Sequence, residues 1–320
     1  FRKKYAIPYS VFLIEDYQAK YYAIMRIAME KDVTVIGTAN PSSILKMCEK
    51  GSRFSEDIIR DIFNGTLSER YRIDNEIRSL IESQLSANPQ RSRNLEDMRR
   101  RRGGLLLPAD YWPNLNLITC WKGGTVGHYI EKFPTWFNPD NDRYIPIRDW
   151  GYLSSEARCS IPTSDTGCAG MLAVATNFYE FVPVDEKEGS GDRSKWTFLS
   201  ANELKDGGKY YIFLTTMGGL YRYDINDIVR VEGKYNDTPR IAFVRKGFDV
   251  SNMTGEKICA NQVIAANRYA SNKTGVNPLH FRAEADIENS RYIIRIECGE
   301  EIPPESAKAY IASFDEYLKH

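Results

Sequence analysis

The sequence predicts a mixed α/β protein with a large N-terminal part and a small C-terminal α/β unit. Helix-like and strand-like segments alternate near the N-terminus, short β-type segments dominate from Leu115, and a helix-strand-strand-helix pattern follows Gly247. A chain of 320 residues is long enough for about two domains. We therefore predict a large domain at residues 1–246 and a small, mobile domain at residues 247–320.

The N-terminal part begins with a helix-strand-helix pattern. Residues 16–30 place apolar side chains, Tyr17 and Tyr21 among them, at helical intervals with charges between them. The β-branched run at residues 33–36 predicts a strand. Asn40 is a preferred helix N-cap and Pro41 suits the first helical position, so a second helix is expected there. This spacing indicates an α/β layer.

Two further helices are predicted at residues 55–63 and 73–85, where apolar side chains recur with the same period. The basic run at residues 99–102 precedes two glycines and could bind an anion. A solvated helix end, where the helix dipole favours cations, is the preferred interpretation.

The central region reads as a series of short strands separated by turns. The expected strands are LNLITCW, RYIPI, MLAVATNFYEFVPV, KYYIFLTT, DIVRV and RIAFVR. The stretch EKEGSGDRS at residues 186–194 is rich in charge and glycine, so we expect a mobile surface loop there. After residue 247, CANQVIAANRYAS and ESAKAYIASFDEYLKH predict helices that flank the strands LHFRAEADI and RYIIRIECG.

Composition narrows the classes of partner. The 43 basic and 43 acidic side chains cancel, so no global field attracts nucleic acid or an anionic membrane. No apolar run approaches the roughly 18 residues of a membrane span, and the default expectation is a cytoplasmic protein. The six scattered cysteines lack metal-ligand spacing and are expected to be reduced and mostly buried. The three histidines do not support a catalytic triad.

One acidic residue does not fit its surroundings. In TTMGGLYRYDINDIVRV, residues 215–231, an extended backbone puts Asp227 on the same face as tyrosines, isoleucine and valines. A carboxylate there needs either a turn that returns it to water or a partner that makes its burial tolerable. A carboxylate can accept both hydroxyls of a ribose. From these residues alone, a turn formed by Asn226 and Asp227 is slightly favoured over ribose binding.

A second candidate is the loop GYLSSEA at residues 151–157, which follows a predicted strand. Tyr152 could stack on a planar base, Ser154 and Ser155 could donate hydrogen bonds, and Glu156 could lie beside a cation and phosphates. The alternative is a polar turn whose serines cap a helix.

Two glycine-containing segments complete the candidates. FVRKGFDVSNMTGEK, residues 243–257, brackets the predicted domain boundary with positive charge and could bind phosphate at a moving junction. A flexible linker with solvated charges is the alternative. GGTVG, residues 123–127, lacks the Gly-Lys-Ser/Thr ending of a phosphate loop but could let the backbone approach a ligand closely.

Taken in order, these segments resemble the acyl-adenylate-forming superfamily and, more closely, its auxin-responsive (Gretchen Hagen) acyl-acid amido synthetases. The resemblance is carried by WPNLNLITCWKGGTVGHY, YLSSEA, TMGGLYRYDINDIVRVEG and FVRKGFDVSNMTGEK, and it covers essentially the whole chain. DYQAKYYAIMRIAMEKDVTVIGTANPSS also resembles bacterial members. The resemblance implies an α/β fold whose large adenylate-forming domain has mixed sheets and a small β-barrel-like part.

The resemblance also implies roles for matching residues. Tyr152, Ser154, Ser155 and Glu156 would hold the adenine and the α-phosphate region, with Glu156 near magnesium. Asp227 would hold the ribose, a role that the order of the motifs favours over the turn. The remaining implied contacts are Arg245 and Lys257 on the phosphates, with Lys257 also catalytic, and Gly123, Gly124 and Thr125 in the wall of the acyl pocket.

The sequence departs from the family pattern at two places. Asn226 stands where the family usually has glycine, and asparagine tolerates left-handed backbone better than most residues. Tyr221 and Tyr223 are then expected to pack, while Asn226 makes the corner. The family's Ser/Thr/Gly-rich phosphate loop does not precede Phe1, and the chain stops inside a predicted helix. We therefore expect a piece of a longer protein that carries part of an ATP site.

The implied activity is a two-step ligation that uses ATP and magnesium. A carboxylic acid would be activated as its adenylate, and the amine of an amino acid would then take the acyl group. Transfer to coenzyme A from the same adenylate, and a non-catalytic relative that retains the fold, are the alternatives. The expected partners are therefore a small carboxylic acid and an amino acid or coenzyme A, with no nucleic acid and no membrane.

Overall fold

The computed structural model describes residues 5–247, 250–251, 258–286 and 291–319. Contacts divide the chain into two compact units, each described here by itself. The first comprises Phe1–Lys122, Val126–Gly151 and Pro162–Cys168, and the second comprises Gly123–Thr125, Tyr152–Ile161 and Ala169–His320. The division between residues 246 and 247 stays a prediction.

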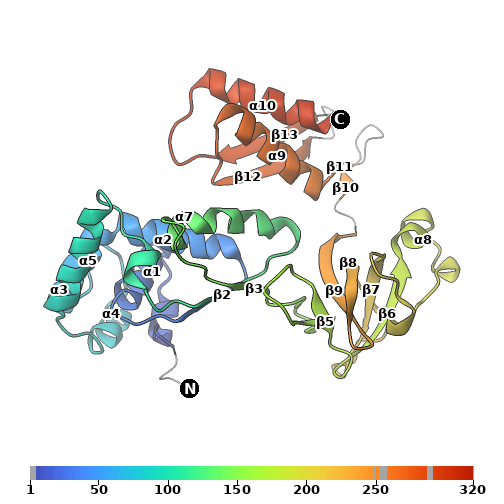
Figure 1. Cartoon of the computed structure of the whole chain (residues 1–320), viewed down its shortest axis with the longest axis horizontal. Helices are drawn as coiled ribbons and strands as arrows, with labels where there is room; N and C mark the ends of the chain where they lie inside the picture. Colours follow the sequence, from blue (N-terminus) through green and yellow to red (C-terminus); the bar gives the residue numbers. More distant parts are fainter. Residues whose placement is uncertain (1–4, 248–249, 252–257, 287–290, 320) are drawn as a thin grey trace. The chain divides into compact units, whose positions relative to one another are not determined.

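The first unit is a helical layer on a small parallel sheet (Figure 1). The sheet has the order β1-β2-β3, with β1 (Val35–Gly37), β2 (Leu117–Thr119) and β3 (Ile147–Arg148). Its helices are η2 (Tyr9–Leu13), α1 (Tyr17–Ala28), α2 (Pro41–Arg53), α3 (Ser55–Asn64), α4 (Asn75–Glu82), α5 (Pro89–Arg101), α6 (Pro108–Tyr111), η3 (Gly124–Lys132) and α7 (Phe133–Phe137). The predicted helix-strand-helix start and the two further helices are confirmed.

Helix ends in this unit follow the expected capping chemistry. The Asn40 side chain accepts a hydrogen bond from the backbone N–H of Ser42, with Pro41 at the first helical position. The basic run ends α5 as predicted, but it is not simply solvated. Arg102 forms ion pairs with Asp110 and Asp140, which fix the end of the helix to other segments.

The buried face of α1 contains only part of the apolar set that recurs at helical intervals. Tyr17 is exposed and Tyr21 half-buried, whereas Tyr22 and Arg26 are fully buried. Periodicity could not identify this face because Tyr22 and Arg26 are buried by hydrogen bonds rather than by apolar contacts alone. Of the apolar side chains at helical intervals, Ile27 and Ala28 are buried and Tyr17 is not.

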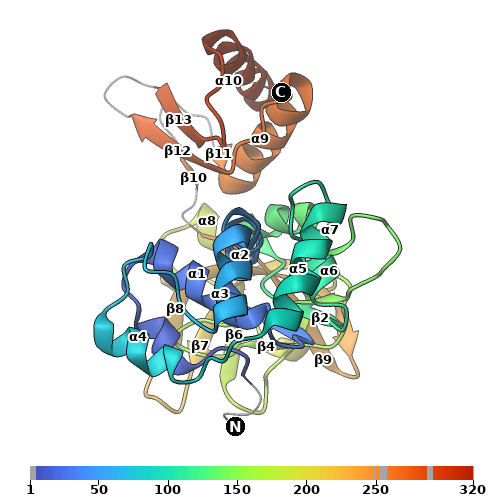
Figure 2. The same cartoon turned by 90° about the vertical axis from the view of Figure 1, so that its left-hand side faces the viewer.

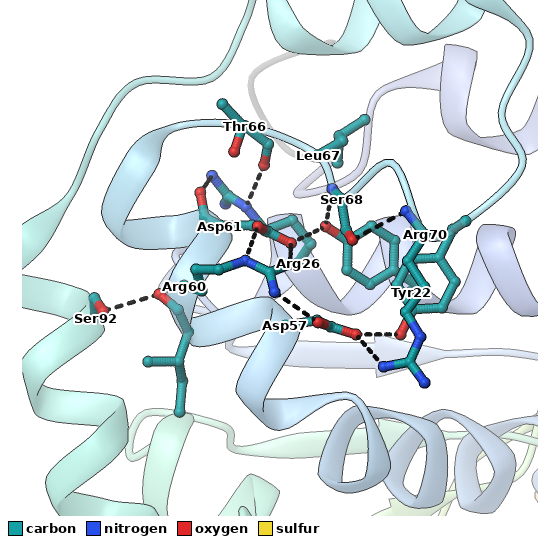
Figure 3. A network of polar contacts seen from close by, with 12 residues as sticks. Tyr22, Arg26, Asp57, Arg60, Asp61, Thr66, Leu67, Ser68, Arg70 and Ser92 are labelled. Atoms are coloured by element: carbon teal, nitrogen blue, oxygen red, sulfur yellow. Dashed lines mark hydrogen bonds and ion pairs between the residues drawn. The ribbon is translucent and has the colours of Figure 1, made fainter.

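Figure 3 shows the polar network that makes this burial tolerable. The Tyr22 hydroxyl donates to Asp61 Oδ2 at 2.6 Å and accepts from the N–H of Ser68 at 2.7 Å. The Arg26 guanidinium donates to the carbonyls of Thr66 and Asp61 at 3.1 and 2.9 Å. Burial and the hydrogen bond to Asp61 raise the pKa of Tyr22 above its usual value. The network ties α1 to α3 and to the loop that follows α3.

The second unit is built on a six-stranded sheet (Figure 1). Its order is β4-β5-β9-β8-β7-β6, with β4 (Ser160–Pro162), β5 (Gly170–Leu172), β6 (Phe178–Pro183), β7 (Lys209–Thr215), β8 (Tyr223–Tyr235) and β9 (Thr238–Lys246). Short helices α8 (Val184–Gly189), η4 (Arg193–Lys195) and η5 (Ala201–Glu203) connect β6 to β7. In the part of the chain that the structure describes, β4 and β6 are the two ends of the strand order and do not pair with each other, so the expected barrel-like part is a sheet instead.

The two faces of this sheet carry separate apolar clusters. One contains Ile225 and Val229 of β8 with Leu214 of β7, and the other contains Phe213 of β7 and Ile228 of β8. The alternation predicted for β8 is therefore confirmed in its centre. Tyr221 and Tyr223 were expected to pack, but their side chains are 84% and 39% exposed.

The stretch predicted as a mobile loop at residues 186–194 is partly helical and partly buried. Residues 184–189 form α8, which packs against β6 and β7 (Figure 1). Lys187 of this helix is only 8% exposed. Composition alone could not reveal this, because the partners that bury the lysine lie far away in the sequence.

The last elements form a compact α/β group (Figure 2). They are β10 (Val250–Ser251), β11 (Ile258–Cys259), α9 (Ala260–Thr274), β12 (His280–Asp286), β13 (Arg291–Glu297) and α10 (Pro304–Leu318). Apolar side chains of α9, β13 and α10 share one cluster, in which Tyr310 and Phe314 are buried. The predicted helix-strand-strand-helix order is confirmed. Among the described residues, no helix is both long and apolar enough to cross a bilayer.

Candidate functional site

The Asp227 side chain is buried inside β8, at 3% exposure. It lies in the middle of a strand rather than at the corner of a turn, so the turn interpretation is wrong. Both carboxylate oxygens have partners: the Tyr152 hydroxyl donates to Oδ2 at 2.5 Å, and the Lys246 ammonium lies 2.6 Å from Oδ1. A buried carboxylate needs such partners to remain charged.

Lys246 is the partner that sequence reasoning did not assign. It stands directly across from Asp227 in the antiparallel pair of β8 and β9. Its side chain is half exposed, so its ammonium keeps contact with water while it neutralises the buried carboxylate. Lysine opposite aspartate is a favourable cross-strand pair, but the pairing register was needed to find it.

Asn226 shapes the backbone before the acid. Its φ of 58° is in the left-handed region, where the predicted tolerance of asparagine applies. Its N–H donates to Asp224 Oδ1 at 3.0 Å, and its carbonyl accepts from the N–H of Gly247 at 2.8 Å. The β7–β8 register shifts between Tyr211 and Phe213, opposite this residue. Asn226 therefore makes a bulge within a strand.

Tyr152 is a buried ring with a polar end. It is 8% exposed and packs in the same cluster as Ile225 and Val229, with the Phe243 ring stacked at 5.8 Å between centroids. Burial, and then the Asp227 charge, raise its pKa far above the usual range, so the hydroxyl stays protonated and donates. In this structure Tyr152 offers its hydroxyl to Asp227 rather than an open face to a base.

The rest of the YLSSEA segment is a hairpin turn, closed by a bridge between Leu153 and Arg158. The N–H of Ser154 donates to the carbonyl of Ala157 at 3.0 Å, and the N–H of Ala157 donates back to Ser154 Oγ at 3.2 Å. Ser154 therefore caps a turn. It does not cap a helix, which the alternative interpretation had assumed. Ser155 and Glu156 are exposed at the tip of the turn.

The glycine loop approaches the aromatic pair. Gly124 has a φ of 64°, and a Cβ atom there would lie 3.0 Å from the Phe243 ring. Gly123 is half-buried just before η3, and Thr125 lies within η3. A Cβ on Gly127 would lie 2.3 Å from the carbonyl oxygen of Lys122. Gly124 and Gly127 therefore need glycine for close packing within the protein, and the approach of a ligand to this loop stays a prediction.

Arg245 is held where β9 ends. Its guanidinium donates to Glu188 Oε1 at 2.9 Å and to the carbonyls of Lys246 and Gly247 at 3.0 Å each. Neither Glu188 nor these carbonyls were anticipated from the sequence. Lys257, the other predicted phosphate contact, lies outside the described residues.

The described residues contain no group of three or more His, Cys, Asp or Glu side chains that could hold a metal ion. Magnesium commonly binds through one or two carboxylates together with substrate phosphates. A single exposed carboxylate such as Glu156 fits that mode of magnesium binding. The described residues do not provide a cage made only of protein ligands. Cys48, Cys120 and Cys159 are buried free thiols.

Comparison with known proteins supplies the family. Residues 1–141 match the model of the GH3 family N-terminal domain, and residues 170–246 match that of the GH3 family central domain. The chain superposes on the GH3.15 acyl acid amido synthetase with a TM-score of 0.76 at 21% identity, covering 98% of this chain and 55% of that one. The two share a fold.

Curated relatives agree. A probable indole-3-acetic acid-amido synthetase GH3.1 of Oryza sativa subsp. japonica is 24% identical over 262 residues, covering 80% of this chain and 42% of the relative. The jasmonoyl-L-amino acid synthetase JAR6 of Nicotiana attenuata is 22% identical over 274 residues, covering 82% and 46%. The chain spans about half the length of the curated relatives it matches. With two family models matching most of its length, the chain belongs to the GH3 family of acyl acid amido synthetases.

Proposed function

We propose that this chain, as part of a longer protein, activates a carboxylic acid with ATP and passes the acyl group to the amine of an amino acid. The observation that carries the proposal is the buried Asp227 carboxylate, held between the Tyr152 hydroxyl and the Lys246 ammonium in a chain of this family. A fixed, charged acceptor on a rigid strand is suited to bind the two hydroxyls of a ribose.

The chemistry would proceed in two steps. A carboxylate oxygen attacks the α-phosphorus of ATP and pyrophosphate leaves, which gives an acyl adenylate. The amine then attacks the acyl carbonyl, AMP leaves and the amine loses a proton. Because the first step brings negative groups together, positioning and charge neutralisation dominate its catalysis. Magnesium, when bound, would supply part of that neutralisation.

We assign the roles within this chain as follows. Asp227 would bind the ribose, and Tyr152 would orient that carboxylate rather than stack on the adenine. For the hydroxyls to reach Asp227, the half-exposed Lys246 side chain would swing towards solvent or towards the phosphates. The other assignments are Ser154, Ser155 and Glu156 on the phosphate side with Glu156 near magnesium, Arg245 and Lys257 on the phosphates, and Gly123, Gly124 and Thr125 beside the acyl group.

The test uses the longer protein that contains this chain. ATP–pyrophosphate exchange would be measured over a panel of carboxylic acids, and the acid that supports exchange would then be incubated with amino acids or with coenzyme A. We expect acid-dependent exchange and an amide product. A thioester product would instead favour acyl-CoA ligation, and no exchange with any acid would overturn the proposal in favour of a non-catalytic relative.

The ribose assignment has its own variant. Asp227→Asn keeps the shape of the side chain but removes its charge, so we expect the KM for ATP to rise about tenfold, corresponding to about 1.4 kcal/mol. Asp237→Asn is the matched control, because this aspartate is exposed in the turn of the same hairpin. A KM for ATP that is unchanged in folded Asp227→Asn would contradict the assignment.

A further inference from the structure

Helix α8 carries two adjacent charged residues that both contact the six-stranded sheet. Lys187 is anchored first: its ammonium donates to both carboxylate oxygens of Asp224 at 2.8 and 2.6 Å and lies 3.9 Å from the centroid of the Tyr211 ring. Phe213 and Trp196 rings lie 5.2 and 5.4 Å away. A carboxylate and three aromatic faces thus surround one cation.

Glu188 follows in the same helix and receives two donors on a single oxygen. The Tyr211 hydroxyl donates to Oε1 at 3.0 Å, and Arg245 Nη2 donates to the same atom at 2.9 Å. The Arg245 side chain is 16% exposed and that of Glu188 is 41% exposed, so water screens this ion pair from one side only. The helix therefore fixes the direction of the arginine.

Arg245 in turn fixes the end of β9. With Nη2 held by Glu188, Nη1 donates to the carbonyls of Lys246 and Gly247, both at 3.0 Å. Gly247 is seated closely, since a Cβ there would lie 2.3 Å from the Tyr211 ring and 2.4 Å from Asn226 Oδ1. Arg245 thus holds the carbonyl of Lys246, while the ammonium of the same residue pairs with Asp227 on the neighbouring strand β8.

We propose that Glu188 is a positioning residue for the candidate site: it holds Arg245 on the carbonyls of Lys246 and Gly247, and so fixes the backbone from which the Lys246 side chain reaches Asp227 or a bound phosphate. The effect on nucleotide binding rests on the proposed function, whereas the effect on the backbone does not. Among the described residues, Glu188 contacts Arg245 and Tyr211, and it touches neither Lys246 nor Asp227.

Two measurements test this in the longer protein with Glu188→Gln, which keeps the shape and removes the charge. The Gly247 N–H, which donates to Asn226, should exchange with solvent about tenfold faster, because Arg245 no longer holds this segment. The KM for ATP in pyrophosphate exchange should rise about threefold or more, with kcat within about twofold, because ground-state positioning is lost.

Glu186→Gln is the matched control. Glu186 lies in the same helix, but its Oε2 accepts from the N–H of Thr197 and it does not contact Arg245. This variant should leave both the Gly247 exchange rate and the KM for ATP as in the parent protein. A general weakening of α8 would instead change both variants alike, and that outcome would overturn the proposal.

A double-mutant cycle closes the argument. Because Glu188 acts through Arg245, the KM of Glu188→Gln combined with Arg245→Lys should equal that of Arg245→Lys alone. Additive effects, or unchanged Gly247 exchange in Glu188→Gln, would overturn the proposal. If Glu188→Gln does not fold, Glu188→Asp, whose shorter side chain no longer reaches Arg245, decides by the same two readouts. If the parent protein shows no acid-dependent exchange, the proposed function fails, and the Gly247 amide still decides this inference.

Discussion

The Asp227 carboxylate lies in an apolar layer because its two partners differ in character. Tyr152 is buried and rigid, and it supplies a directed hydrogen bond. Lys246 is half exposed, and it supplies charge while remaining partly hydrated. An ion pair with one hydrated member avoids the full desolvation cost of two buried charges. Under the proposed function, the ribose would reach this carboxylate when the lysine side chain moves aside.

Asn226 makes the most direct residue-scale prediction. At a φ of 58°, glycine is unstrained, so Asn226→Gly should change the free energy of unfolding by less than about 1 kcal/mol. Asn226→Val should lower it by about 2 kcal/mol or more, because a β-branched residue is strained at positive φ. Urea denaturation followed by circular dichroism measures both. Equal stability of the two variants would show that this backbone conformation is not needed.

Local pattern was enough to single out Asp227 but not to find its partner. Alternation marked it as the one carboxylate on the face of Ile225 and Val229. The pairing with Lys246 depends on a register that contains two irregularities between β8 and β9, and no local rule specifies these. Tyr221 was expected to pack, but it precedes the first residue of β8 and stays exposed.

At the scale of elements, α8 shows why a charged, glycine-rich stretch can still be ordered. The helix has only six residues, too few to be stable by propensity alone. Its order comes from tertiary contacts of Lys187 with Asp224 and with aromatic rings of β7. The sequence could predict a turn-rich connection, but it could not predict which distant side chains would bury the lysine.

The contribution of this anchor can be measured with Lys187→Met, which keeps the apolar stem and removes the ammonium. We expect a loss of about 2–3 kcal/mol in the free energy of unfolding, somewhat below the range for a fully buried pair because Asp224 is 28% exposed. Lys195→Met is the control. Its ammonium is exposed and 3.8 Å from Asp192, so the loss should be below about 0.5 kcal/mol. Similar losses in chemical denaturation of both variants would mean that the contacts of Lys187 with Asp224 and the aromatic rings add no stability.

At the scale of the whole molecule, the positions of helices and strands were largely predictable and their assembly was not. Alternation identified β7, β8 and β9, and helical periodicity with caps identified α1, α2 and α10. The expected barrel-like part is an open sheet in the described residues, because closure depends on whether the edge strands β4 and β6 meet. That is a property of strand order, which local patterns do not encode.

The buried thiols and phenols predict how the stability of the whole chain changes at high pH. Burial raises the pKa of the Cys120 and Cys159 thiols from near 9 to about 12, and that of the Tyr179 and Tyr310 phenols from near 10 to about 12. The folded state therefore keeps protons that the unfolded chain loses. The stabilisation is fully present below about pH 9 and is lost as pH rises towards 12.

We therefore expect the urea midpoint of unfolding to fall steadily above about pH 9, more steeply above about pH 10, where the unfolded tyrosines also begin to ionise. For Cys159 the loss can reach at most about 1.4 kcal/mol per pH unit. Cys159→Ala should reduce this slope, whereas Cys168→Ala, at a partly exposed position, should retain it. A midpoint that is constant from pH 7 to pH 10.5, or equal slopes in the two variants, would contradict the assignment of these thiols as buried acids.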